Sequence, residues 1–462
     1  MRGDTTAERL QRCRRKFFHR YMELTMTNPV QRIFADRLAP CGILVASVLL
    51  LALGSARWVC AQSEKNSPAP YASIATDGER YAGPGRESAF DLPEPVLHIA
   101  LLVPLHGPEK ADGETIVAAA QMALRDASQR PMPGGRRLAL AIGDESGPSW
   151  GLISDVVMRL VFDQDAVALI TSTSGTDAHV SEQVGNRIGV PILTLSADAT
   201  TTQIDIPWIF RVGSSDVLQA QVIARNIYRD RGLKSVLMIV ERDHDGQSGA
   251  AAMRQAAQSW DASPPYELVL DPLQPDFASV LTRIQTQPEQ AMVLWTGAET
   301  AGKLLRSLRA AGIHTPTYLS QQAAQAGSGT NFSEADPSAK TESNAASLWT
   351  VVTNEDDAAT RQSFARRYQQ AMGMLPSPTA TEAYDTVCLT VRALRAAGPN
   401  RARVRDQLAK MRNFPGASGT ISFDREGNNP TLAHLVRLAE SESSERKHMQ
   451  REYAAATGAT QP

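Results

Sequence analysis

The 462-residue sequence has few cysteines, few aromatic residues, no excess of charge of one sign and a single long hydrophobic run. Lys plus Arg (47) nearly balances Asp plus Glu (49), which gives no indication of a basic surface for nucleic acid or anionic lipid. Hydrophobic residues make up 42% and charged residues 21% of the chain, values that are ordinary for a soluble globular protein. We therefore expect two or three globular domains and no nucleic-acid partner.

Cysteine is almost absent from the part of the chain expected to fold. Cys13, Cys41 and Cys60 lie near the N-terminus, and Cys388 stands alone in the remainder. One thiol cannot form an internal disulfide, so the fold must depend on its hydrophobic core. Cys388 shares a predicted helix face with Tyr384, which favours a small buried hydrophobic residue over the alternative of a reactive thiol.

Motifs of enzymatic chemistry are also missing. The sequence has no phosphate-binding loop of Walker type, no GxGxxG after a strand, no nucleophile elbow, and no CxxC or HExxH. The histidines are scattered, with His98 in a predicted strand, His179 on a helix and His244 in a loop. The run Asp243-His244-Asp245 resembles a metal cluster, but adjacent side chains point in different directions, which favours a solvated loop. We expect no enzyme activity, no cofactor and no metal.

The only long hydrophobic run covers 15 residues, Gly42 to Ala56, after a basic segment and before the small-residue pattern Val59-Cys60-Ala61. This order is typical of a secretory signal that is cleaved after Ala61. A membrane-spanning helix needs about 20 residues, so release into the periplasm or extracellular space is expected, and a membrane anchor remains the alternative. Residues 1–61 are thus a signal peptide or anchor.

Between residues 96 and 438, apolar strands alternate with helices of about 10 to 15 residues, the pattern of parallel α/β sheets. Two successive series of similar size predict two lobes, and Gly419–Leu438 reads as a final hairpin. The flanking segments are polar. Residues 62–95 are predicted to be a linker and residues 439–462 a disordered tail.

Two polar loops stand out within Ala166–Arg211, which reads as strand, loop, helix, strand and loop. Thr171–Thr176 and Ser196–Thr202 consist mainly of small hydroxyl residues, and each follows the carboxyl end of an apolar strand. Ligands of open α/β sheets bind at this edge. The loops predict capture of a small polar molecule, and the alternative is that their hydroxyls only cap the following helices.

Several segments carry a resemblance to a known family, in the same order along the chain. They include IALLVPLHGPEKADGETIVAAAQMALRDA, VALITSTSGTDA, IGVPILTLSADATTT, MVLWTGAETAGKLLRSLRAAGI and FPGASGTISFDREGN. From about Val96 to Leu438 the chain resembles the type I periplasmic binding proteins of branched-chain amino acid and amide ABC transporters. The resemblance implies two Rossmann-like α/β lobes with parallel sheets, joined by a three-segment hinge.

The resemblance also implies boundaries and partners. Lobe one would comprise residues 96–216 and 353–412, and lobe two residues 217–352 and 413–438. The protein would be a monomer that captures an amino acid, an amide or a related carboxylate and presents it to an ABC transporter permease in the inner membrane. The alternative is a ligand-sensing or envelope-regulatory protein that uses the same lobes.

In the family, the carboxylate of the ligand is held by a serine in the first polar loop and by a threonine and backbone amides in the second. Ionised groups that accept such hydrogen bonds gain roughly 1.5–3 kcal/mol from each. Residues of lobe two are further candidates for contact with the ligand. The candidate ligand-binding residues are Ser172, Thr173, Ser174, Ser196, Asp198, Ala199, Thr200, Asp245, Glu299 and Gln321.

The chain departs from the family at two places. Asp245 stands where relatives have an aromatic residue, and Gln321 and Gln322 stand where amino-acid binders place an acidic residue on the α-ammonium group. Because a buried ammonium needs a carboxylate, either Asp198, Asp245 or Glu299 supplies it, or the ligand is not an α-amino acid. The alternative that Asp198 and Asp245 are ordinary solvated loop carboxylates also remains open. If Asp245 faces the ligand, leucine, isoleucine and valine should bind poorly.

Overall fold

The computed structural model of the protein describes residues 92, 95–147, 150–203, 207–325, 348–353, 358–373, 376–430 and 433–438. The predicted signal segment, nearly all of the linker and the predicted tail lie outside these residues. Among the helices in the described ranges, none is long and apolar enough to cross a membrane.

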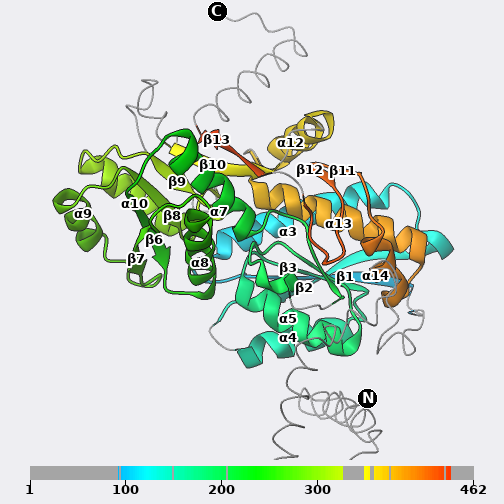
Figure 1. The fold of residues 1–462 in the computed structure, drawn as a ribbon. Helices are drawn as coiled ribbons and strands as arrows, with labels where there is room; N and C mark the ends of the chain where they lie inside the picture. The colour runs from blue at the N-terminus through cyan, green and yellow to red at the C-terminus, as the bar shows by residue number, and fades with distance from the viewer. Residues whose placement is uncertain are drawn as a thin grey trace, which may run out of the picture. The chain divides into compact units, whose positions relative to one another are not determined.

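Lobe one is built on a parallel sheet with the strand order β2-β1-β3-β4-β5 (Figure 1). In the interior strand β1, the side chains from Ile99 to Val103 are fully buried, because helices cover both faces of the sheet. One face packs against α3, α13 and α14, and the other against α4 and α5. The elements are β1 (Val96–Val103), α3 (Lys110–Ser128), β2 (Arg137–Asp144), α4 (Trp150–Phe162), β3 (Ala168–Thr171), α5 (Gly175–Ile188), β4 (Ile192–Thr194), α6 (Thr200–Gln203), β5 (Ile209–Arg211), α12 (Ala358–Met372), α13 (Pro378–Ala397) and α14 (Arg401–Ala409).

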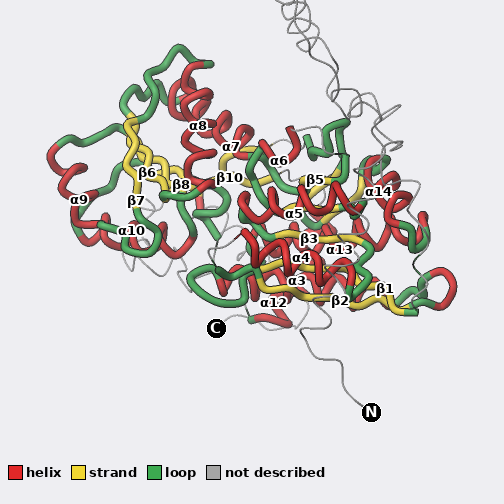
Figure 2. The backbone as a smooth tube through the Cα atoms, turned by 90° about the horizontal axis from the view of Figure 1, so that it is seen from below, coloured by secondary structure: helices red, strands yellow, loops and turns green. Residues whose placement is uncertain are grey.

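Lobe two has the strand order β13-β10-β9-β8-β6-β7, in which β13 alone runs antiparallel to its neighbour (Figure 1). Figure 2 shows β6, β7 and β8 of this sheet side by side. Its sheet is also covered on both faces, by α7 and α8 on one and by α9 and α10 on the other. The elements are α7 (Asp216–Ala224) with a π-helical turn (Arg225–Asp230), β6 (Val236–Glu241), α8 (His244–Gln258), β7 (Tyr266–Leu270), α9 (Phe277–Thr286), β8 (Ala291–Trp295), α10 (Ala298–Ala310), β9 (Thr317–Leu319), β10 (Leu348–Thr353) and β13 (Ala433–Arg437).

The end of the chain corrects two sequence-based expectations. Gly419–Leu438 does not form one hairpin, because β12 (Gly419–Ile421) pairs with β11 (Phe414–Gly416) and β13 pairs with β10. Ala417, Ile421 and Phe423 belong to the core of lobe one, so the segment from 414 to 423 lies in that lobe although the sequence assigned it to lobe two. This segment belongs to lobe one because its apolar side chains pack in the core of that lobe, where Phe423 contacts Phe210.

The chain passes between the lobes at three places. The first is between β5 and α7, as expected, and the second joins β10 to α12. The third lies between β12 and β13, later than the expected boundary between residues 412 and 413. Cys388 packs against the core of lobe one, and burial raises the pKa of its thiol to about 12, in agreement with the prediction of an unreactive residue.

Candidate functional site

The two polar loops lie at the carboxyl edge of the lobe-one sheet, where the sequence places them. In the first loop, the hydroxyl of Ser174 accepts from the backbone N–H of Asp177 at 3.3 Å and caps α5. The hydroxyl of Ser172 accepts from the N–H of Ser174 at 3.2 Å. Both hydroxyls therefore have local structural roles, and Thr173 between them lines a cavity.

The second loop is folded around the carboxylate of Asp198. The hydroxyl of Ser196 accepts from the N–H of Asp198 at 3.1 Å. The N–H and the hydroxyl of Thr200 donate to Oδ1 of Asp198 at 2.9 and 2.7 Å. The N–H of Ala199 donates instead to Oδ1 of Asp216 at 3.1 Å, so two carboxylates take up the donors of this loop.

Arg211, which was not among the sequence candidates, stabilises the second loop through hydrogen bonds. It is 1% exposed, and its Nε donates to the carbonyl oxygen of Ser196 at 3.0 Å. Its other nitrogens donate to the carbonyl oxygen of Asp198, to Thr201 and to Asn428. An arginine at the end of a short apolar strand was the available signal, because a buried guanidinium needs several acceptors.

The N-terminus of helix α8 places Asp243, His244 and Asp245 of lobe two next to the polar loops of lobe one. Asp243 caps the helix by accepting from the N–H of Gly246 at 2.7 Å. Asp245 reaches lobe one and accepts from the N–H of Gly175 at 3.1 and 3.2 Å. The expected solvated loop is therefore the N-cap and first turn of a helix, with each residue turned to a different partner.

Ser248, one turn further along α8, adds contacts to lobe one. Its hydroxyl donates to Oδ1 of Asp198 at 3.3 Å and to Oδ2 of Asp216. Together with the bond from Gly175 to Asp245, these contacts tie the two lobes directly to each other.

A cavity of ≈ 20 Å³ remains between the lobes, room for about one water molecule. Three acidic residues, Asp198, Asp216 and Asp245, line it, and none of the described lining residues is Lys or Arg. Trp295 at the end of β8 forms an apolar part of the wall. The remaining lining residues are Thr173, Ala197, Gln219, Ser248, Ser320 and Gln322.

Of the ten sequence candidates, Thr173, Asp198 and Asp245 line this cavity and the other seven do not. Two of these seven come from lobe two. Glu299 lies in the first turn of α10, where it pairs with Lys303 at 2.5 Å. Gln321 donates to the buried carboxylate of Glu382 at 2.8 Å, near the hinge, whereas its neighbour Gln322 lines the cavity. Four lining residues were not among the sequence candidates: Asp216, Gln219, Ser248 and Trp295. For Trp295, the available signal was its position at the end of an apolar strand, before Thr296-Gly297.

Burial and mutual repulsion shift the pKa values of the acidic groups around the cleft. Burial raises the pKa of Asp216 and raises that of Asp245 well above the ordinary range. Burial, with repulsion from Asp112 and Asp177, raises the pKa of Glu109 to about 7. A positively charged ligand in the cleft would reduce the repulsion among these carboxylates.

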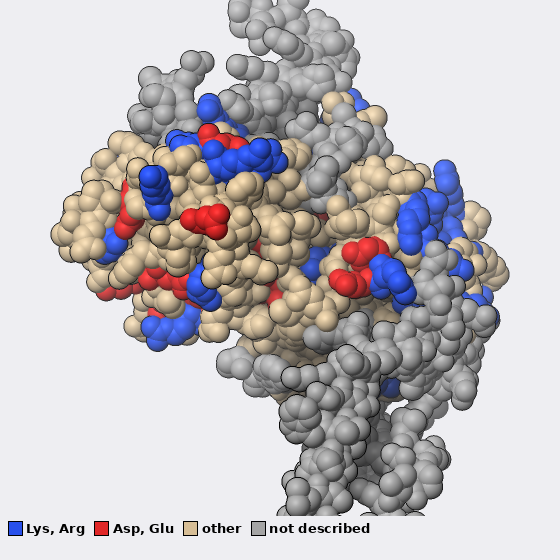
Figure 3. All heavy atoms as spheres, in the orientation of Figure 1, with Lys and Arg blue, Asp and Glu red and all other residues tan. Residues whose placement is uncertain are grey.

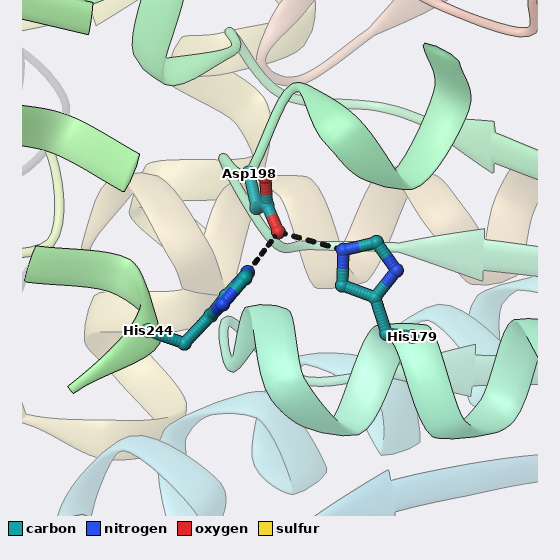
Figure 4. Close-up of side chains that lie close together, drawn as sticks. All are labelled: His179, Asp198 and His244. Carbon is teal, nitrogen blue, oxygen red and sulfur yellow. Dashed lines mark hydrogen bonds and ion pairs between the residues drawn. The ribbon is translucent and has the colours of Figure 1, made fainter. Parts of the chain in front are cut away.

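Asp198 is the exception among these acids, because two imidazole rings approach it (Figure 4). Burial opposes its ionisation, but hydrogen bonds from His179, His244 and Thr200 outweigh burial and hold its pKa below the ordinary range. The Nε2 atoms of His179 and His244 lie 2.9 and 2.5 Å from Oδ2 of Asp198. His179 comes from α5 in lobe one and His244 from α8 in lobe two.

Comparison with known proteins agrees with the two-lobed fold. The family model described as "Periplasmic binding protein" matches residues 96–446. Leu/Ile/Val-binding protein homolog 3 of Brucella melitensis is 24% identical over 343 residues, which cover 72% of this chain and 88% of that protein. Shorter matches are Leu/Ile/Val-binding protein BraC3 of Rhizobium johnstonii (25% identity over 45% of this chain) and Glutamate receptor 3.2 of Arabidopsis thaliana (23% over 45%). The chain spans 56% and 23% of the length of these two relatives.

Solved structures share the arrangement of the lobes. The substrate-binding protein LivJ from Streptococcus pneumoniae, in complex with isoleucine, has a TM-score of 0.64 and 20% identity. That match covers 74% of this chain and 95% of LivJ. A solute-binding protein from R. palustris, in complex with benzoate, has a TM-score of 0.65 and 17% identity over 74% of this chain and 93% of its own. At these identities the likeness shows the fold.

Proposed function

Because the chain belongs to the periplasmic binding protein family, we propose that its two lobes close on a small, positively charged solute rich in hydrogen-bond donors. The observation that carries this proposal is the cavity, which presents the carboxylates of Asp198, Asp216 and Asp245 without a described Lys or Arg in its lining. Isoleucine, leucine and benzoate in the related structures carry no net positive charge, so an acidic lining would not favour them over a cation.

The size of the cavity supports a cycle of opening and closing. A space of ≈ 20 Å³ cannot hold a solute larger than water, so entry requires Asp245 and Ser248 to leave their lobe-one partners. The lobes then close again with the solute between them, because it contacts both lobes only in the closed form. A bound solute must therefore replace the contact of Asp245 with Gly175 and the contacts of Ser248 with Asp198 and Asp216.

A thermal-shift series tests the proposal. The panel contains arginine, lysine, spermidine and guanidinium as cations, with leucine as a neutral amino acid and benzoate as an anion. We expect at least one of the cations to raise the Tm, and Asp216→Asn to abolish most of the rise. Asp155→Asn at an exposed position of α4 is the control and should leave the rise in Tm unchanged. A rise with leucine or benzoate alone would contradict the proposal.

We propose further that the mature protein begins at Gln62 outside the cytoplasm and delivers its solute to an ABC transporter permease as a monomer. The order of basic segment, apolar run and small residues supports the cleavage site. Intact-mass spectrometry of the protein from the periplasmic fraction should give the mass of residues 62–462. A full-length mass in the membrane fraction would favour the anchored alternative.

The surface is consistent with binding of a small solute. On the face shown in Figure 3, groups of acidic and basic residues are interspersed and no broad basic field is present among the described residues. Such a face gives no support to a nucleic-acid partner.

A further inference from the structure

We propose that a divalent transition metal ion of the zinc class binds to His179, Asp198 and His244 at the seam between the lobes and fastens the closed form. The ligand atoms of these three residues lie within 4.8 Å of one another. Figure 4 shows both rings pointing at the same carboxylate, one from each lobe. The rings meet edge to face, with centroids 5.4 Å apart, so neither blocks the other.

The distances suit a metal site after a small outward movement. The nitrogen–oxygen distances of 2.9 and 2.5 Å are those of direct contacts. Bonds of about 2.0–2.2 Å at tetrahedral angles separate two zinc ligands by roughly 3.3 Å. The rings therefore need to move by less than about 1 Å, which His244 can do because its side chain is 42% exposed.

Glu182 provides a second observation that points to a cation. Its carboxylate is fully buried, and within the described residues neither oxygen has a well-formed hydrogen bond. Its Oε2 lies 3.3 Å from Nδ1 of His179, on the side of the ring opposite to Asp198. A carboxylate behind a histidine ligand fixes the ring so that Nε2 faces the metal, and it strengthens the ligand.

The donor set selects the kind of ion. Two imidazole nitrogens and one carboxylate oxygen suit Zn²⁺, Ni²⁺ or Cu²⁺, whereas Mg²⁺ and Ca²⁺ prefer oxygen ligands. A tetrahedral ion has room for a fourth ligand, and the hydroxyl of Thr200, 2.9 Å from Nε2 of His179, lies beside that position. A divalent ion would also offset the charge of the two buried carboxylates, Asp198 and Glu182.

The metal site is distinct from the solute cavity. His179 and His244 are not among the lining residues of the cavity, and Asp198 alone is common to both. A metal that requires one ligand from each lobe binds the closed form better than the open form, so it shifts the population toward closure. This inference does not depend on the identity of the solute.

Titration calorimetry of the chelator-treated full-length protein tests the site with ZnCl₂ and MgCl₂. We expect one zinc ion per chain and no response to magnesium. His244→Ala should weaken zinc binding at least tenfold and keep the wild-type Tm in the absence of metal, since the ring is half exposed. His314→Ala, which removes an exposed histidine from lobe two, is the matched control and should leave the affinity unchanged. Equal zinc affinity in wild type and His244→Ala would overturn the proposal.

Three further measurements separate this site from the solute site and from a merely structural role of the histidines. Cobalt should give the intense visible absorption of a four-coordinate ion in wild type, and His179→Gln should lose it. Asp216→Asn should bind zinc as wild type does even though its solute binding fails. Small-angle scattering should show a smaller radius of gyration with zinc in wild type but not in His244→Ala. No cobalt band in wild type, or a zinc-induced compaction that survives His244→Ala, would contradict the proposed bridge.

Discussion

The carboxylate of Asp245 in lobe two accepts the backbone N–H of Gly175 in lobe one, with both oxygens within 3.2 Å of the nitrogen. Gly175 is the first residue of α5, so its N–H belongs to the positive end of that helix. An acidic group from one lobe thus binds a helix N-terminus of the other, in the manner of an anion at such a site. This contact joins the lobes without any solute.

Gly175→Ala should open the lobes. A Cβ at this position would lie 2.5 Å from Oδ1 of Asp245 and 3.0 Å from Cβ of Asp198. The shorter of these two approaches, to Asp245, is between the lobes, and the approach to Asp198 within lobe one is less severe. The Tm of the protein without solute should therefore change by no more than a few degrees. Small-angle scattering should show a larger radius of gyration than in wild type.

Gly151→Ala is the matched control, because this glycine also lies in the first turn of a helix and a Cβ there would meet nothing within 4 Å. It should leave the radius of gyration unchanged. If Gly175→Ala gives the same radius as wild type and Gly151→Ala, the contact between Asp245 and Gly175 does not hold the lobes together.

Arg211→Lys should destabilise the second polar loop. The buried guanidinium reaches the carbonyl oxygens of Ser196 and Asp198 together, and a lysine ammonium cannot span both. We expect the free energy of unfolding to fall by about 2 kcal/mol, the value of one or two hydrogen bonds to a charged group. Urea denaturation measures it, and Arg137→Lys at an exposed position of β2 should change it by less than about 0.5 kcal/mol. A loss for Arg211→Lys no larger than that of the control would show that the loop does not depend on Arg211.

Glu382→Gln should change how stability depends on pH. Burial raises the pKa of Glu382 from 4.5 to about 8, and the side chain accepts from Gln321. A raised carboxyl pKa means that the folded protein binds the proton more tightly than the unfolded chain does. The resulting stabilisation is complete below pH 4.5 and is lost as the pH rises through about 8.

Glutamine remains neutral, so the variant should gain stability relative to wild type between pH 5 and pH 8, by up to about 1.4 kcal/mol per pH unit. Urea denaturation at both pH values measures the difference. Glu114→Gln on the exposed side of α3 is the control and should show no such trend. A constant difference between Glu382→Gln and wild type would mean that Glu382 is ionised in the folded protein throughout this range.

Much of the fold could be predicted because strands buried on both faces are continuous apolar runs, such as Ile99–Val103, and helices separate them regularly. The pairing of β12 with β11 could not be predicted, since strands of three residues carry no periodic signal and their partner is set by packing around Phe423. The end of the chain therefore read as one hairpin.

The site was predictable in part for a similar reason. Hydroxyl-rich loops after β3 and β4 mark the edge of the sheet, but their hydrogen bonds depend on residues elsewhere, such as Asp216. His179 and His244, which both contact Asp198, are 19 and 46 residues away from it in the sequence. The contact with His244 also forms only when the two lobes come together. The spacing of residues within one segment of the sequence cannot predict such a contact.

Titration calorimetry with leucine and with arginine, on wild type and on Asp216→Asn, tests the central claim most directly. We predict that leucine gives no measurable heat at micromolar concentration, because it carries no net positive charge and its aliphatic side chain would face Asp198, Asp216 and Asp245. Arginine, as the cationic probe, should bind wild type, and Asp216→Asn should weaken that binding at least tenfold. Micromolar binding of leucine, together with no binding of arginine, would contradict the claim that this cleft selects positively charged solutes.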